Sequence, residues 1–168
     1  LARCIESIGD VLRAMGEKPL ALKTFQECLS LRKELALESG DLGSRREVAA
    51  VHVRLGHVLR AMGDSTNALA AFREGMVLAE TLAQESASSS TALVSAAEAA
   101  VFQAERALFC FRTASVLADG GKAEKDEARV LLLQALAVYH DLEQRNVLPE
   151  AHKIWPPAIE AMLDSLDT

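Results

Sequence analysis

The sequence predicts an all-α protein built from stacked antiparallel helical hairpins, an α-solenoid. Two observations lead to this fold class. Ala and Leu dominate a chain of 168 residues in which 50% of residues are hydrophobic and only 4% are aromatic, a composition that favours helices over strands. The hexapeptide Val-Leu-Arg-Ala-Met-Gly also occurs twice, at Val11 and at Val58, an offset of 47 residues. Repeats of about 20 to 50 residues are typical of stacked supersecondary units.

The first hairpin is expected within residues 1–40. Apolar residues recur at three- and four-residue spacing, which indicates one face of a helix: Ile5, Ile8, Leu12 and Met15. Gly16 ends this helix, because glycine readily adopts the left-handed backbone found after helix ends. Pro19 suits the first turn of a second helix, where its missing N–H is not needed, and that helix is expected to reach about Ser39.

The second hairpin is expected within residues 43–86. Ser44 is predicted to cap its first helix, with Glu47 three residues later completing a capping box. This helix is expected to stop at Gly63, and its partner to begin at Ser65 or the residue before it. The pattern thus repeats the helix, glycine and helix order of the first hairpin.

The third hairpin is expected within residues 91–146. The Ser-rich stretch 86–91 before it is interpreted as a loop between hairpins, with a domain boundary as the alternative. One long helix should run from about Ala92 to Leu117, and its partner should end near Arg145.

A terminal helix is expected within residues 149–167, where it would cover the apolar end of the stack. Pro149 and the pair Pro156-Pro157 interrupt the helical pattern, so a turn around Trp155 is expected before this helix. The 168 residues are interpreted as a single domain. Because residue 1 already lies in a helical pattern, we expect the domain to be part of a longer protein.

Charge and composition limit the classes of partner. A net charge of −6 argues against nucleic-acid binding, which usually requires a basic surface. No uncharged stretch is long and apolar enough to insert into a membrane. Cys4, Cys28 and Cys110 form no C-x-x-C pair, so buried thiols in a reducing, cytoplasmic compartment are expected.

Both copies of the repeat carry a recognisable motif. The tetratricopeptide pattern reads W-x2-L-G-x2-Y followed by A-x3-F. The first copy has Ile5-x2-Ile8-Gly9-x2-Leu12 and then Ala21-x3-Phe25; the second has His52-x2-Leu55-Gly56-x2-Leu59 and then Ala68-x3-Phe72. The chain therefore resembles tetratricopeptide-repeat proteins. Small residues in this pattern let paired helices approach closely, and phenylalanine fills the space between hairpins.

The resemblance is incomplete. The period of 47 residues exceeds the usual period of about 34, which is similar to long-helix members such as kinesin light chains, Pins-type polarity adaptors and bacterial repeat arrays. The third hairpin is degenerate: Ala128, Leu132 and Ala135 keep the register of the second helix, but Thr113 or Ala114 stands where the glycine would fall. The resemblance implies a right-handed superhelix of about three hairpins plus the terminal helix.

It also implies a function, which is to bind a peptide or partner helix in a concave groove lined by the first helix of each hairpin. Carried over by position, the groove residues are Glu6, Asp10, Arg13, Val53, Arg54, His57 and Arg60. Arg13 and Arg60 lie one repeat apart and could form a ladder for carboxylates, although solvated surface arginines are the alternative. The expected role is an interaction scaffold or adaptor.

No enzyme, metal site or cofactor is predicted. His52 and His57 are five residues apart and lie on different helix faces, and the sequence has no H-E-x-x-H motif. Two other functions remain open. One is a ligand-sensing regulatory domain, which would need a buried polar pocket among Asp10, Arg13, His57 and Arg60; the other is self-association through exposed hairpin ends.

Overall fold

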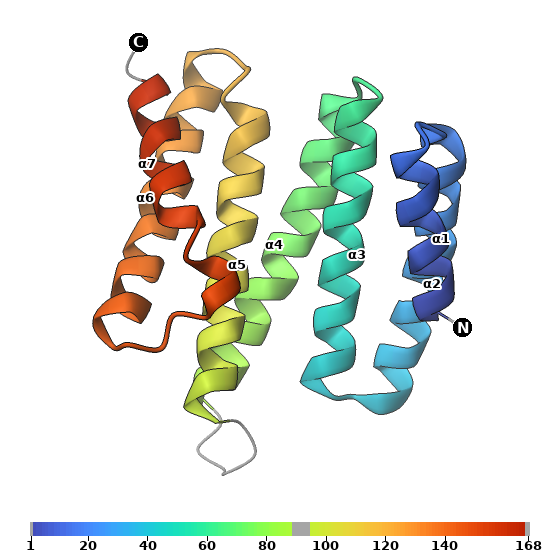
Figure 1. The fold of residues 1–168 in the computed structure, drawn as a ribbon, viewed down its shortest axis with the longest axis horizontal. Coiled ribbons are helices and arrows are strands. Elements are labelled where there is room, and N and C mark those ends of the chain that lie inside the picture. The colour runs from blue at the N-terminus through green and yellow to red at the C-terminus, as the bar shows by residue number, and fades with distance from the viewer. Residues whose placement is uncertain (1, 89–94, 167–168) are drawn as a thin grey trace. The chain divides into compact units, whose positions relative to one another are not determined.

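The computed structural model describes residues 2–88 and 95–166. Within these ranges it contains seven α-helices, one 3-10 helix and no strand, so the predicted all-α class is confirmed. The chain divides into two compact units, Leu1–Leu78 and Ala79–Thr168. The ribbon in Figure 1 labels the helices of both units.

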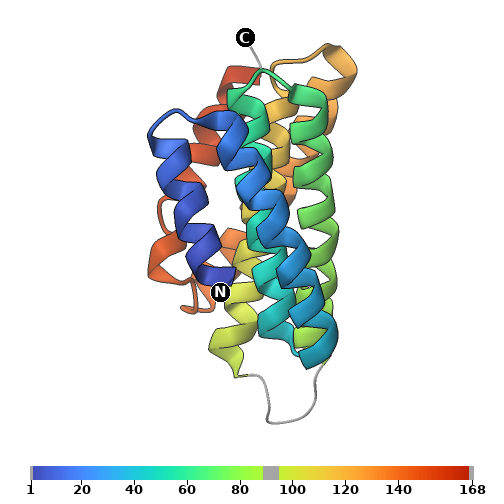
Figure 2. The same cartoon turned by 90° about the vertical axis from the view of Figure 1, so that its right-hand side faces the viewer.

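Unit 1 consists of paired antiparallel helices. It contains α1 (Ala2–Ala14), α2 (Lys18–Ser39), α3 (Leu42–Ala61) and the beginning of α4 (Ser65–Ser88). Figure 2 shows α1 and α2 side by side in opposite directions. Helix α2 packs against both α1 and α3. The predicted order of helices in the first two hairpins is confirmed.

A glycine and a phenylalanine make the same close contact in each hairpin of unit 1. A Cβ atom on Gly9 would lie 2.6 Å from Cε1 of Phe25, and one on Gly56 would lie 2.6 Å from Cε1 of Phe72. Both phenylalanine side chains are fully buried. The aromatic ring therefore occupies the space that any side chain at the glycine would need, which explains the spacing seen in the sequence.

In unit 1 the first helix of each hairpin ends in the same turn. Gly16 and Gly63 have positive φ angles of 82° and 83°, the left-handed conformation expected there. The amide after each glycine donates to the carbonyl five residues earlier: Glu17 to Leu12 (2.9 Å) and Asp64 to Leu59 (3.0 Å). Glycine thus ends both helices because its backbone takes the φ angle that this turn requires.

The start of α3 differs from the prediction. Asp41 is the N-cap, and its Oδ1 accepts a hydrogen bond of 2.7 Å from the backbone N–H of Ser44. Hydrogen bonds from Ser39 and Ser44 lower the pKa of Asp41 to about 2. The predicted capping box of Ser44 and Glu47 is wrong, because an aspartate three residues earlier already accepts the amide hydrogen.

Unit 2 contains the remainder of α4, then α5 (Ala96–Leu117), α6 (Lys122–Gln144), a 3-10 helix (Glu150–His152) and α7 (Trp155–Leu166). Helix α6 packs against α5 and α7. The side chains predicted to keep the register of the third hairpin are all fully buried: Ala128, Leu132 and Ala135. At the end of α6, Asn146 takes the left-handed position with φ 55°.

The Ser-rich segment is more helical than expected. Helix α4 continues to Ser88, and Ser86 is buried with its hydroxyl donating to the carbonyl of Ala83 (2.9 Å). The rest of the predicted loop, and the predicted helix start at Ala92, lie outside the described residues. Helix α5 begins at Ala96 after Ser95, which forms a capping box with Glu98.

The turn predicted around Trp155 is formed by Lys153 and Ile154, directly before it. Helix α7 begins at Trp155, and Pro156 and Pro157 occupy its first turn, where the missing N–H groups have no helical partner to lose. The range 149–167 predicted for the terminal helix begins too early, because residues 150–152 form the 3-10 helix before this turn. Ile159 of α7 is fully buried.

One buried hydroxyl links three elements of unit 2. Tyr139 of α6 donates to the carbonyl of Ala104 in α5 (3.0 Å) and lies 3.2 Å from Nδ1 of His152 in the 3-10 helix. Its side chain is fully buried, and this burial raises the pKa of Tyr139. A buried tyrosine hydroxyl needs such partners, so Tyr139 fixes the irregular segment after α6 against the hairpin.

Candidate functional site

Three of the residues predicted to line the groove form ion pairs between α1 and α3 in unit 1. Arg54 of α3 lies between two carboxylates of α1: its Nη1 is 2.9 Å from Oε1 of Glu6, and its Nε is 3.3 Å from Oδ2 of Asp10. These ion pairs join the first helices of successive hairpins. Glu6, Asp10 and Arg54 therefore share one surface, as the resemblance to tetratricopeptide repeats implied.

Arg32 of α2 extends this network below the surface. Its Nη2 lies 2.9 Å from Oε2 of Glu6 and also pairs with Glu47, while only 11% of its side chain is exposed. Burial by itself would lower the pKa of Arg32, but the hydrogen bond and charge of Glu6 and the charge of Glu47 outweigh it and raise the pKa. Among the described residues, its buried Nε has no hydrogen-bond partner. Arg32 holds Glu6 in place beneath Arg54.

Arg13 forms the exposed edge of the network. Its Nε lies 3.7 Å from Oδ1 of Asp10, with side-chain exposures of 50% and 41%. Ion pairs at such exposed positions contribute only about 0 to 1 kcal/mol. A partner carboxylate could therefore replace Asp10 at little energetic cost.

The other predicted residues differ in accessibility. Val53 is only 8% exposed and offers little surface to a partner. His57 is exposed, and its ring forms a T-shaped pair with that of Phe72 at a centroid distance of 5.3 Å. Arg60 is exposed in the last turn of α3, as Arg13 is near the end of α1. The network cannot repeat in the second hairpin, because Val53 and His57 stand at the positions of Glu6 and Asp10.

His52 takes the tryptophan position of the repeat motif and is buried against α4. It is 5% exposed, and its Nδ1 lies 3.6 Å from Oε2 of Glu74. Burial lowers the pKa of His52 from the usual 6.5 and Lys33 lowers it further, whereas the charge of Glu74 acts in the opposite direction. His52 is thus a neutral packing residue near pH 7.

This burial should make the stability of the chain depend on pH. The unfolded state binds the imidazole proton more tightly, so the free energy of unfolding should be highest above pH 6.5 and fall as the pH decreases below it, by at most about 1.4 kcal/mol per pH unit. We expect His52→Gln to reduce this slope between pH 7.5 and 5, measured by urea denaturation. His140→Gln, at an exposed position, is the control. Equal slopes for His52→Gln and the original chain would contradict the assignment.

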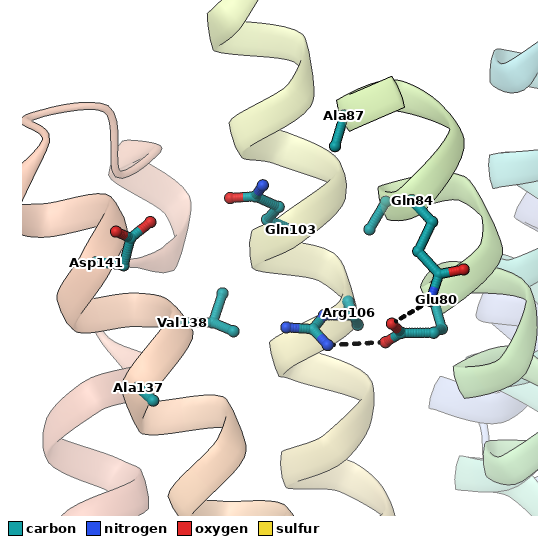
Figure 3. A pocket seen from close by; sticks show the side chains of 9 residues that line it. Glu80, Gln84, Ala87, Gln103, Arg106, Ala137, Val138 and Asp141 are labelled. Carbon is teal, nitrogen blue, oxygen red and sulfur yellow. Dashed lines mark hydrogen bonds and ion pairs between the residues drawn. The ribbon is translucent and has the colours of Figure 1, made fainter. Parts of the chain in front are cut away.

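Unit 2 contains a pocket that the sequence did not predict. It has a volume of about 420 Å³ and lies among the end of α4, α5 and α6. Figure 3 shows its polar residues, with Arg106 of α5 paired to Glu80 of α4 at 2.8 Å and the amide of Gln84 donating to Glu80 at 2.8 Å. Burial would raise the pKa of Glu80, but these hydrogen bonds and the charge of Arg106 lower it.

Small side chains form much of the pocket wall. They are Ala83, Ala87 and Ala137. Asp141 at the rim pairs with Arg145 at 2.9 Å, and both side chains are about half exposed. The charged groups at this pocket therefore already have partners in the chain. No motif marks the pocket because its lining comes from three helices.

The cysteines follow the prediction only in part. Cys28 and Cys110 are buried, and burial raises the pKa of both thiols, so they remain protonated near neutral pH. Cys4 is exposed, so its predicted burial is wrong. In the described ranges, no three His, Cys, Asp or Glu side chains are grouped so that they could hold a metal ion. No helix of these ranges has the length and apolar character needed to span a membrane.

The paired helices and the repeated contact between glycine and phenylalanine define a helical-hairpin repeat protein. Residues 49–80 match the family model described as Tetratricopeptide repeat. This match identifies that segment, which holds most of α3 and the first part of α4, as a tetratricopeptide repeat. Comparison with curated proteins and with solved structures finds no match to the chain.

Proposed function

We propose that the chain is a protein–protein interaction scaffold or adaptor that binds a peptide or partner helix on one face of unit 1. Tetratricopeptide repeats generally mediate protein–protein interactions, and stacked repeats use extended surfaces for binding. We call the surface that carries the following residues the α1–α3 face: Glu6, Asp10, Arg13, Arg54, His57 and Arg60. The observation that best supports this proposal is the ion-pair network, which holds charged groups from two helices in fixed positions.

The network indicates which groups a partner would meet. Glu6 pairs with both Arg32 and Arg54, and Arg54 also pairs with Asp10. Glu6 and Arg54 therefore act mainly as a rigid base. Arg13 and Arg60 are exposed at the ends of their helices and offer planar guanidinium groups that bind carboxylates with two hydrogen bonds. We therefore expect a partner segment that presents acidic side chains to Arg13 and Arg60.

The exposure of these residues favours a scaffold over a ligand-sensing domain. A small-molecule site usually encloses most of its ligand in a concave pocket. Arg13, His57 and Arg60 are exposed and Asp10 is only partly buried, so they form an open surface that suits a peptide or helix. The buried thiols Cys28 and Cys110 support a reducing, cytoplasmic location as part of this proposal.

The double variant Arg13→Glu/Arg60→Glu tests the α1–α3 face. Ligands would first be selected from a displayed peptide library with the original chain, and their affinities measured by fluorescence polarisation. We expect the double variant to bind an acidic peptide at least tenfold more weakly, because two attractive charges become repulsive, while its circular-dichroism spectrum stays the same.

Lys23→Glu/Lys125→Glu is the matched control, since it makes the same charge change at exposed positions of α2 and α6. It should bind the acidic peptides almost as well as the original chain. If Arg13→Glu/Arg60→Glu binds them with unchanged affinity, the α1–α3 face is not the binding surface.

A further inference from the structure

Helix α1 has two apolar stripes, and one of them is uncovered. Ile5 and Leu12 pack on the hydrophobic core together with α2. The second stripe lies about 80° around the helix from the first, as its residue numbers require at 3.6 residues per turn. It consists of Cys4, Ile8, Val11 and Met15, and we call it the α1 stripe. Cys4 is exposed, and Ile8, Val11 and Met15 are 54%, 57% and 71% exposed. An exposed row of large apolar side chains on one helix face indicates an interaction surface.

The same stripe exists in α3, where it is covered. At the offset of 47 residues, the equivalents of the α1 stripe are Val51, Leu55, Val58 and Met62. The first three are 0%, 6% and 0% exposed. They belong to one hydrophobic cluster with three buried residues of α2: Ala21, Phe25 and Cys28. The cover of the α3 stripe is therefore the second helix of the preceding hairpin.

A polar contact fixes the register of that covering helix. Lys18 at the start of α2 donates from Nζ to the carbonyl of Ala61, the last residue of α3, at 2.7 Å. The equivalent of Ala61 in α1 is Ala14, which also ends its helix. Helix α1 thus repeats both parts of the surface that binds α2: the apolar stripe and the helix end that accepts the lysine.

We propose that the α1 stripe is a docking surface for the second helix of another repeat hairpin, packed on α1 as α2 packs on α3. The bound helix would carry a small residue, a phenylalanine and a second small residue in the spacing of Ala21, Phe25 and Cys28. A lysine at its start would donate to the carbonyl of Ala14. This surface is separate from the α1–α3 face, because it uses apolar side chains that take no part in the ion-pair network.

A chain lengthened by one repeat tests this proposal. A second copy of residues 1–47 is fused to the N-terminus of the full chain, so that the added copy of Phe25 precedes Cys4 by 26 residues, as Phe25 precedes Val51. The added copy carries Cys4→Ser, which leaves the original Cys4 as the exposed thiol to follow. We expect the modification of Cys4 by a maleimide, followed by peptide mass spectrometry, to slow at least tenfold in the lengthened chain.

Two substitutions in the original α1 separate docking from other effects. In the lengthened chain, Ile8→Asp places a carboxylate in the α1 stripe and should restore rapid modification of Cys4. Ser7→Asp, which adds the same charge at an exposed position beside the stripe, should not. In the unextended chain both variants should melt at about the same temperature as the original, because Ile8 is 54% exposed there.

Two results would overturn the proposal. One is equally fast modification of Cys4 in the original and the lengthened chains. The other is a dimer of the unextended chain, detected by light scattering, that Ile8→Asp dissociates, because the occupant of the α1 stripe would then be a second copy of the chain.

Discussion

Gly56→Leu is expected to unfold unit 1 at a much lower temperature than the original chain. A Cβ atom at this position would lie 2.6 Å from Cε1 and Cζ of Phe72, and leucine would add three more carbon atoms. Phe72 is fully buried, so its ring has no free space to enter. Overpacking a core usually costs about 1 to 3 kcal/mol and sometimes more, and we expect this substitution to lie at or above the upper value. Thermal melting followed by circular dichroism measures the effect.

A smaller pair of substitutions isolates the contact. Gly56→Ala gains about 1 kcal/mol of helix propensity but still places its Cβ against the ring, so we expect net destabilisation. Combining it with Phe72→Leu should cost less than the sum of the two single substitutions. Phe72→Leu removes the ring against which the alanine clashes, and the alanine methyl group fills part of the cavity that Phe72→Leu leaves. Additive losses, or a Gly56→Leu variant that melts at the original temperature, would contradict this packing.

Arg32→Met is expected to lower the free energy of unfolding by about 2 kcal/mol. Removing one partner of a buried ion pair usually costs about 3 to 5 kcal/mol. Here the loss should be smaller, because Glu6 keeps Arg54 as a partner and Glu47 is 48% exposed. Urea denaturation measures the change. A double-mutant cycle with Glu6→Gln should give a favourable coupling energy between Arg32 and Glu6.

Arg145→Met provides the comparison for Arg32. Its ion pair with Asp141 has the same length of 2.9 Å, but both side chains are about half exposed. We expect a loss below about 1 kcal/mol there. If the two variants lose equal stability, burial does not strengthen the Arg32 network.

The sequence predicted the features that depend on local chemistry. Gly16 and Gly63 end their helices because few other residues adopt the required φ angle, and this preference is visible in the sequence. The spacing of Gly56 and Phe72 likewise indicated that the two residues pack closely within the hairpin. The predicted N-cap of α3, Ser44, was wrong because Asp41 is an equally good N-cap three residues earlier. Only the backbone path decides which of the two accepts the hydrogen bond.

Features that join distant residues were not predictable in the same way. The resemblance to tetratricopeptide repeats implied that Glu6 and Arg54 share one surface, but it gave no reason to include Arg32, which lies on the second helix of the hairpin. The pocket beside Arg106 was missed because its wall combines side chains from three helices. Cys4 was expected to be buried because the three cysteines form no C-x-x-C pair, yet the burial of a thiol depends on a neighbouring helix.

The shared turn at Gly16 and Gly63 has a consequence for the evolution of the chain. The hexapeptides ending at these glycines are identical, and both adopt the same backbone conformation. A crossover between them would delete 47 residues and lead α1 through an unchanged turn into α4, with Phe72 replacing Phe25 opposite Gly9. The reciprocal product would gain one whole hairpin. Recombination at this site would therefore change the length of the protein in complete structural units, and each helix of the product would be intact.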